Sequence, residues 1–257
     1  MFIRDSLETL GKYLLLMYRV FGKPDKWKMY FRQLLLEMET LGLSSLGIVI
    51  IISIFMGAIM VIQIKLDMDN PLLPVYTVGL ATRDVLLLEF SSTIMCLILA
   101  GKVGSNIASE IGTMRITEQI DALEIMGVNS ANFLILPKVS AFIIMMPMLV
   151  IISMAMGMIG GYSVALFSGI VTVTEFEIGL QFAFVPYHVF YSIFKSLVFA
   201  FIISSVASYY GYNVKGGALD VGKASTNAVV NSSILILLSN IVITNFMLAY
   251  PKKHFTQ

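Results

Sequence analysis

Five long apolar runs, separated by short polar segments, constrain this chain more than any other feature of its sequence. They lie at about Leu46–Ile64, Val85–Gly101, Val139–Phe167, Tyr187–Tyr209 and Val229–Tyr250. A helix needs about 20 apolar residues to cross a bilayer core about 30 Å thick. Only 13% of the 257 residues are charged, about half the share of a typical soluble domain. The sequence therefore predicts an all-α membrane protein with five transmembrane helices.

The first 43 residues differ from the rest because they are basic and amphipathic. The stretch from Pro24 to Leu43 places its larger apolar side chains along one helical face, namely Trp27, Tyr30, Phe31, Leu34, Leu35 and Met38. Such a segment lies in the headgroup plane and does not cross the bilayer; the alternative is a cytosolic helix packed on a partner. The opening MFIRDSLETLGKY lacks an early apolar core, so we expect no cleavable signal peptide. We divide the chain into an N-terminal interfacial region, 1–43, and a five-span domain, 44–257.

The distribution of basic residues predicts the orientation. Segments 1–43, 102–138 and 210–227 hold 12 of the 17 Lys and Arg residues. Basic residues are retained on the cytoplasmic side of a membrane. We therefore expect a cytoplasmic N-terminus and, after five crossings, a C-terminus on the outside.

One segment between the second and third runs, Gly101–Lys138, carries a dense set of charges. Its part from Arg115 to Met126 is predicted to form a short amphipathic helix. One side of this helix holds Ile116, Ile120, Leu123 and Gly127. A second, acidic stripe holds Glu118, Asp121 and Glu124. Asn129 and Ser130 supply a cap for the next helix. Such a helix is either a solvated loop helix or the place where a soluble partner pushes on the membrane domain.

The run AGKVGSNIASEIGTMRITEQIDALEIMGV, at positions 100–128, resembles a signature of the MlaE/YrbE family. These proteins are permease subunits of ABC transporters that work with MCE proteins to move lipids between membranes. The stretch YYGYNVKGGALDVG, at positions 209–222, is similar to the family's second signature. The resemblance implies that the E-Q-I-D-A-L helix is the coupling helix that docks on the ATPase. The residues expected to couple are Arg115, Glu118, Gln119, Asp121, Ala122, Leu123, Glu124, Met126 and Gly127.

The family resemblance also indicates residues that line a lipid cavity between the first, second and fifth spans. These candidates are Met56, Ile59, Met60, Gln63, Glu89 and Lys195. A buried Gln63 could equally bond a neighbouring helix, and Lys195 could either snorkel outward or face a polar cavity. The family usually carries an Arg before the glutamate, followed by Gly-Pro, whereas this chain has Leu88-Glu89-Phe90-Ser91-Ser92. Arg83 is the upstream residue that could replace the missing charge.

Spacing alone predicts one packing surface in the third span. Ser153, Gly157 and Gly161 lie four residues apart and form a face of small residues that lets another helix approach closely.

The absence of catalytic, metal-binding and nucleotide-binding motifs argues against an enzyme. It has no H-E-x-x-H motif, neither His188 nor His254 has a nearby His or Cys, and no Walker-type phosphate loop is present. An ion-coupled secondary transporter or channel, using Glu89 and Lys195, is the alternative reading, but we find no internal repeat.

The resemblance therefore implies a homodimeric, non-catalytic ABC permease of the bacterial inner membrane, with a periplasmic C-terminus, that moves phospholipid. Its partners are expected to be a second copy, a separate ATPase that holds Mg-ATP, and a periplasmic MCE-domain lipid-binding protein. We expect no cofactor or metal in this chain and no nucleic-acid partner.

Overall fold

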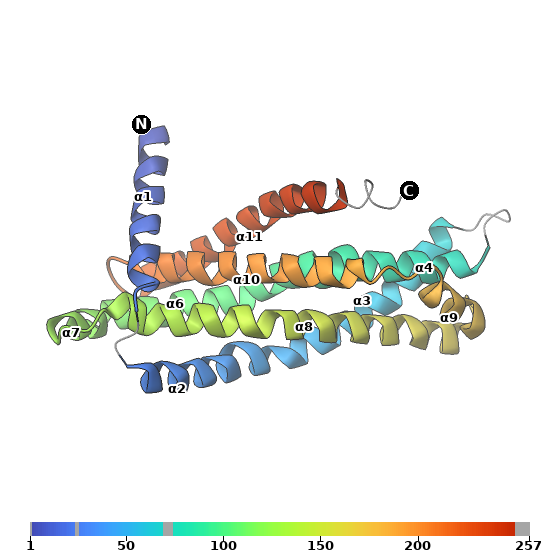
Figure 1. Cartoon of the computed structure of the whole chain (residues 1–257), viewed down its shortest axis with the longest axis horizontal. Helices are drawn as coiled ribbons and strands as arrows, with labels where there is room; N and C mark the ends of the chain where they lie inside the picture. The colour runs from blue at the N-terminus through green and yellow to red at the C-terminus, as the bar shows by residue number, and fades with distance from the viewer. Residues whose placement is uncertain (1, 24–25, 69–73, 250–257) are drawn as a thin grey trace. The chain divides into compact units, whose positions relative to one another are not determined.

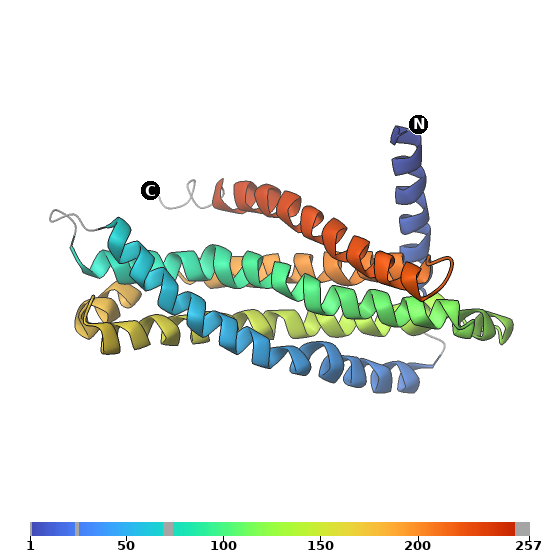
Figure 2. The same cartoon turned by 180° about the vertical axis from the view of Figure 1, so that it is seen from behind.

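The computed structural model describes residues 2–23, 26–68 and 74–249, and these residues form helices joined by short turns (Figures 1 and 2). Five stretches are long and apolar enough to cross a membrane: 27–67, 76–116, 130–168, 187–212 and 218–247. No strand occurs in the described part of the chain. The predicted all-α class with five spans is confirmed.

The elements follow one another with few breaks. The first two helices are α1 (Phe2–Val20) and α2 (Trp27–Glu37). A π-helical segment η1 (Met38–Gly42) and a 3-10 turn η2 (Leu43–Ser45) carry α2 on into α3 (Leu46–Asp67). The second span consists of α4 (Tyr76–Val85), π-helical η3 (Leu86–Ile94), α5 (Met95–Leu99), π-helical η4 (Ala100–Gly104) and α6 (Ser105–Ile116). The remaining helices are α7 (Gln119–Ile125), α8 (Ser130–Ser168), α9 (Val173–Gln181), α10 (Tyr187–Tyr212) and α11 (Ala218–Ala249).

Three predicted spans are shorter than the helices that contain them. The third was expected to begin at Val139, whereas α8 begins at Ser130. The second was placed at Val85–Gly101, whereas the helix runs from Tyr76 to Ile116; the fifth was placed from Val229, whereas α11 begins at Ala218. In all three cases polar residues next to the apolar run continue the helix, because Lys and Glu are good helix formers and need only water or a partner for their charges. The stretch expected to lie in the headgroup plane runs on into the first span, and the boundary at residues 43 and 44 stays a prediction.

The helices pack into two compact units. The first comprises residues 1–44, 97–145 and 199–239, and the second comprises residues 45–96, 146–198 and 240–257.

In the second unit, glycines allow backbones to touch. A Cβ added to Gly57 of α3 would overlap the backbone of Gly157 in α8, and one added to Gly160 would overlap Ile54 of α3. The Ser53 hydroxyl donates to Ser153 across the same contact, at 2.8 Å. The predicted small-residue face of the third span is thereby confirmed. A similar glycine contact between Gly79 and Gly179 joins α4 to α9, which lie side by side in Figure 1.

In the first unit, a buried lysine binds two carboxylates. Lys138 of α8 is 2% exposed and lies 2.6 Å from Glu37 of α2 and 2.8 Å from Glu110 of α6. Two of the charged residues in segment 101–138, Glu110 and Lys138, thus pair with each other between packed helices and do not lie in a solvated loop.

The direction of α1 differs from that of its neighbours. Figures 1 and 2 show α1 turned away from the direction that α2 and α8 share.

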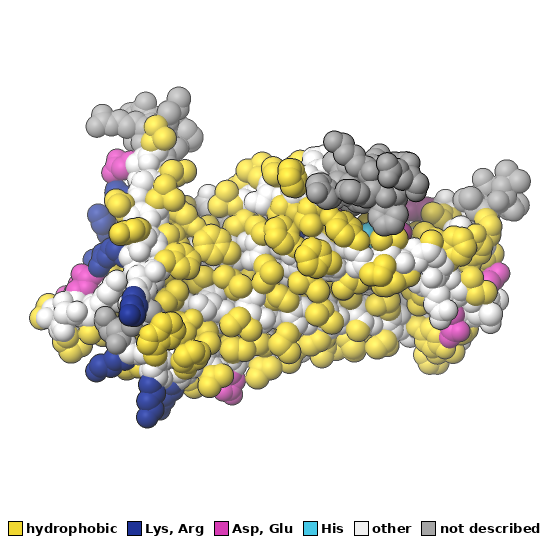
Figure 3. Space-filling view, viewed as in Figure 1, with side chains coloured by type: hydrophobic (Ala, Val, Ile, Leu, Met, Phe, Trp, Pro, Cys, Tyr) yellow, Lys and Arg dark blue, Asp and Glu magenta, His cyan; other side chains and the backbone are white. Residues whose placement is uncertain are grey.

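The surface is largely apolar. Figure 3 shows hydrophobic side chains over most of the visible face, and exposed residues such as Phe55, Ile151 and Val242 lie on three different spans, each at least 48% exposed. Water does not tolerate such extensive apolar surface, whereas lipid does. The chain is a multi-pass membrane protein.

The glycine contact predicts a position-specific effect of added methyl groups. Gly57→Ala forces α3 and α8 apart, and we expect it to lower the free energy of unfolding by at least about 3 kcal/mol. Gly47→Ala lies on the same helix with open space around its Cβ, and we expect it to be neutral or stabilising by up to about 1 kcal/mol. Thermal unfolding in detergent measures both variants, and equal midpoints would contradict the proposed contact.

Candidate functional site

The short helix α7 interrupts the path between two membrane helices. We predicted that it starts at Arg115, but Arg115 and Ile116 belong to α6, and α7 begins only at Gln119. Glu118 between them has a φ of 59°, a left-handed conformation that reverses the chain and breaks a continuous helix. The predicted end is confirmed, because Gly127 has a φ of 77°, which glycine adopts without strain.

The side chains of α7 divide into a packed face and a free face. Ile120 is fully buried, whereas Ile125 is 87% and Met126 is 68% exposed. Gln119 and Ala122 are also exposed, and Leu123 is half-buried. Ile125 was missed by the sequence analysis because it lies off the apolar face formed by Ile120 and Leu123. A large apolar side chain that is free at the tip of a short helix is typical of a protein contact.

One carboxylate, that of Glu124, joins α7 to three other helices. Its Oε1 accepts hydrogen bonds from Ser130 of α8 at 2.9 Å, from Tyr212 of α10 at 2.9 Å and from Arg19 of α1 at 3.0 Å. The hydrogen bonds from Ser130 and Tyr212, followed by that from Arg19 and its positive charge, hold the pKa of Glu124 below its ordinary value. The acidic stripe is therefore turned at least partly toward its own chain.

Arg115 of α6 contacts both α7 and α10. Its guanidinium donates to Asp121 at 2.7 Å and lies 5.9 Å from the centre of the Tyr212 ring. Tyr212 thus contacts Glu124 of α7 through its hydroxyl and Arg115 of α6 through its ring face. A displacement of α7 would therefore disturb contacts of α10 at this tyrosine.

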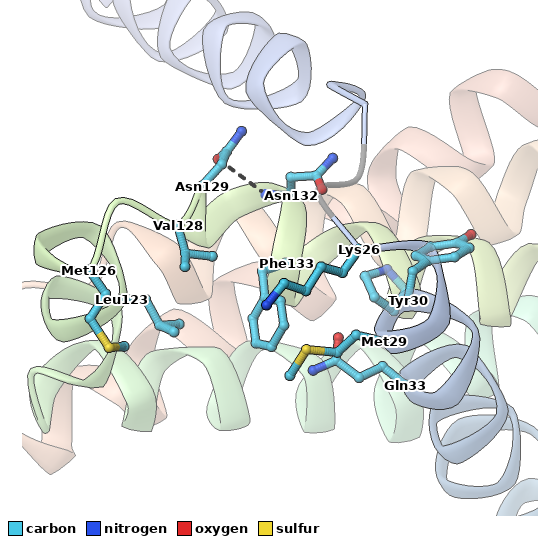
Figure 4. A pocket seen from close by; sticks show the side chains of 11 residues that line it. Lys26, Met29, Tyr30, Gln33, Leu123, Met126, Val128, Asn129, Asn132 and Phe133 are labelled. Atoms are coloured by element: carbon cyan, nitrogen blue, oxygen red, sulfur yellow. Dashed lines mark hydrogen bonds between the residues drawn. The ribbon is translucent and has the colours of Figure 1, made fainter.

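The end of α1 is attached to the first turn of α8. Asn129 donates to the carbonyl of Arg19 at 3.0 Å, and Asn132 donates to the carbonyls of Val20 and Gly22, both at 2.7 Å. These amides satisfy carbonyls that a helix end leaves free. Asn129 also accepts the Asn132 N–H (Figure 4), so the predicted cap of this helix is confirmed.

A pocket of about 340 Å³ opens between the start of α2, α7 and the first turns of α8 (Figure 4). Its walls are apolar at Leu123, Met126 and Phe133, and among the described residues that line it Lys26 is the only charged one. Figure 4 shows the Lys26 side chain extended beside the Phe133 ring.

A second polar cluster lies in the second unit and involves two of the predicted cavity residues. Lys195 of α10 is fully buried and donates to Glu89 of η3 at 3.1 Å and to the Leu88 carbonyl at 3.2 Å. The other Glu89 oxygen accepts from Asn240 of α11 at 3.2 Å and from Thr93 at 3.0 Å. The Glu89 side chain is still 43% exposed, so this carboxylate has both a fixed position and access from outside.

Lys195, and not Arg83, supplies the positive charge beside Glu89. Arg83 is 2% exposed and is held by Asp84 and by the carbonyls of Leu180 and Phe182. The interpretation of Lys195 as an outward-snorkelling residue is therefore wrong. Residues 89 and 195 are too far apart in sequence for their pairing to be read from spacing.

The other cavity candidates share one helix, α3. Ile59 and Gln63 are exposed, and Met56 and Met60 are half-buried, so the expectation of a buried Gln63 is wrong. That these four residues line a lipid cavity stays a prediction. No three His, Cys, Asp or Glu side chains converge on a metal-sized site in residues 2–23, 26–68 and 74–249.

Comparison with known proteins identifies the family of this chain. The profile of the family "Permease MlaE" matches residues 34–246. A probable ABC transporter permease protein of Rickettsia bellii is 36% identical over 242 residues, which cover 92% of this chain and 91% of the relative. One of Synechocystis is 34% identical, covering 84% and 82% of the two chains. The intermembrane phospholipid transport system permease protein MlaE of Haemophilus influenzae is 28% identical, covering 95% and 93%. The chain belongs to the MlaE permease family of ABC transporter membrane subunits.

Proposed function

We propose that this protein is the membrane subunit of an ABC transporter that moves phospholipid between membranes, driven by a separate ATPase that docks on α7. The observation that carries the proposal is that one side of α7 is exposed while another is hydrogen-bonded to its own chain. Its outer face is free at Ile125, whereas its inner side is bonded through Glu124 to α1, α8 and α10. A partner that pushes on the free face would therefore move several helices at once.

In this mechanism the nucleotide is Mg-ATP on the partner and no cofactor is needed in this chain. Two copies of the permease form the complete transporter, in the bacterial inner membrane, with α7 and the N-terminus in the cytoplasm and the C-terminus in the periplasm. A periplasmic MCE-domain protein exchanges lipid with a cavity between the first, second and fifth spans. The name of the Haemophilus relative, a phospholipid transport permease, and the excess of basic residues in segments 1–43, 102–138 and 210–227 support these assignments.

Glu89 is proposed to contact the transported lipid. Its carboxylate is positioned by Lys195, Asn240 and Thr93, and it keeps access from outside. It lies within a π-helical segment, a distortion that is frequent at functional sites. An ion-coupled transporter could use the same pair, and the absence of an ATPase from the purified complex would favour it.

A charge on the free face of α7 tests the docking. We expect Ile125→Asp to weaken ATPase binding by about 2 kcal/mol, or roughly 30-fold, because a buried hot-spot residue is replaced by a carboxylate. Co-purification and titration with the ATPase measure the loss. Phe167→Asp is the matched control, since Phe167 is 88% exposed at the far end of α8. Undiminished binding by a folded Ile125→Asp variant would count against α7 as the docking element.

Glu124 predicts a pH-dependent attachment of α7. A depressed pKa means that the folded state favours the carboxylate, so its stabilisation is complete above the ordinary value of 4.5 and disappears as the pH falls through the lower folded value. We expect hydrogen exchange of residues 119–125, corrected for its intrinsic pH dependence, to be protected at neutral pH and exposed under strongly acidic conditions. Glu124→Gln should lose the protection already at neutral pH, and Asp121→Asn, which affects only the Arg115 pair, should lose less. Equal loss in both variants would show that Glu124 has no special role.

The Glu89–Lys195 pair predicts an asymmetry between its two members. Glu89→Ala leaves a fully buried lysine without its carboxylate and should cost about 3–5 kcal/mol of stability. Lys195→Met should cost less, because Glu89 keeps Asn240, Thr93 and partial exposure. Thermal unfolding in detergent measures both effects.

The double variant Glu89→Ala/Lys195→Met separates structure from lipid contact. We expect it to regain much of the stability of the wild type but to retain less phospholipid after purification, measured by mass spectrometry. Recovery of both stability and lipid content would mean that Glu89 serves only to neutralise Lys195.

A further inference from the structure

The pocket beside α7 has the composition of a site for an amphipathic anion. Its interior is mostly apolar, with Met29, Leu123, Met126 and Phe133 among the walls and the amides of Gln33, Asn129 and Asn132 beside them. The one charged group among its described lining residues is the Lys26 ammonium. A volume of about 340 Å³ falls within the usual range of small-molecule sites, roughly 300–1,000 Å³. An apolar chain would occupy the space between these walls, and an anionic group would neutralise the Lys26 ammonium.

The surroundings of the pocket are basic. Lys23, Lys26, Lys28 and Arg32 lie within ten residues, and none of them makes an ion pair with a described residue. Asp25 offsets one of these charges in the sequence. Figure 3 shows Lys and Arg side chains gathered near the end of α1 and the start of α2. Basic pockets at the ends of membrane helices attract anionic lipid headgroups.

Aromatic side chains mark this place as the membrane interface. Trp27 packs on Tyr30 with ring centres 5.9 Å apart and on Phe31 at 6.1 Å, and Tyr30 lines the pocket. Trp and Tyr concentrate at the headgroup level of a bilayer, and Trp27 begins the helical stretch 27–67 that contains the first span. The pocket is thus placed where a lipid of the adjacent leaflet could enter it.

We propose that this pocket binds one anionic phospholipid of the leaflet that surrounds the start of α2. Its phosphate would pair with Lys26, and part of an acyl chain would lie against Phe133, Leu123 and Met126. The lipid would contact Leu123 and Met126 but not Ile125, which does not line the pocket, so a soluble partner could still bind at Ile125. Leaflet composition would then act on the position of α7. This proposal depends on the membrane placement of the chain and not on the proposed transport activity.

The only tryptophan of the chain, Trp27, gives a direct test without an ATPase. The full-length protein is reconstituted in phosphatidylcholine vesicles that contain either brominated phosphatidylglycerol or the same amount of brominated phosphatidylcholine, and quenching of tryptophan fluorescence is measured. We expect stronger quenching by the anionic lipid. Lys26→Gln, and Val128→Phe, which fills the pocket without changing charge, should each reduce the quenching to the level of brominated phosphatidylcholine.

Lys28→Gln is the matched control, because Lys28 carries the same charge two residues away and does not line the pocket. It should keep the excess quenching. Equal losses in Lys26→Gln and Lys28→Gln would mean diffuse surface attraction and overturn the proposal, as would an absence of preference for phosphatidylglycerol in the wild type. A photoreactive residue in place of Phe133 should form lipid adducts in cells; adducts to the ATPase alone would assign the pocket to the protein partner and also overturn it. A failure of ATPase docking at Ile125 would leave these results unchanged.

Discussion

Buried positive charge is the constraint on which this structure depends. Arg83, Lys138 and Lys195 are each at most 2% exposed, and each lies within 3.1 Å of a carboxylate oxygen. A charge in a low-dielectric interior is tolerated only when it is paired and hydrogen-bonded. Because the partners of Lys138 and Lys195 come from other helices, these pairs fix how the helices are packed. Apolar side chains alone could slide past one another in lipid with little penalty.

The lysine at position 138 also supports the proposed role of α7 in passing force from an ATPase to the membrane helices. Lys138 joins α8 to Glu110 of α6 and to Glu37 of α2, and α7 connects the ends of α6 and α8. The two helices that flank α7 are therefore bonded to each other behind it. Together with the Glu124 contacts to α1 and α10, this arrangement prevents α7 from moving as an independent loop. Work done on its free face would be passed to packed helices.

Sequence reasoning succeeded where the property is local and failed where it is not. Apolar runs gave the number of spans, and the four-residue spacing of Ser153, Gly157 and Gly161 gave a packing face, because both depend on helix geometry alone. The second span was predicted to end at Gly101 and the fifth to begin at Val229, but their helices extend to Ile116 and begin at Ala218. Charged residues continue a helix when a distant partner or water receives them. The charge beside Glu89 also depends on tertiary packing, and Arg83 was the nearest upstream basic residue that the sequence offered for it. The true partner lies 106 residues away and is chosen by packing.

Close glycine contacts and hydrogen bonds at exposed groups resist deformation by different physical means, and this difference bears on where a conformational change can occur. In the second unit, Gly57 meets Gly157 and Gly79 meets Gly179 backbone to backbone, so separation loses dispersion contacts that no water or lipid restores at the same density. In the first unit, α7 and the end of α1 are held mainly by hydrogen bonds at partly exposed groups, such as Glu124 and Arg19. Such bonds exchange for water at small net cost. The first unit therefore contains the contacts that can be remade during a transport cycle, and Glu124, which connects four helices through a single oxygen atom, is the contact whose rearrangement would reposition most of them.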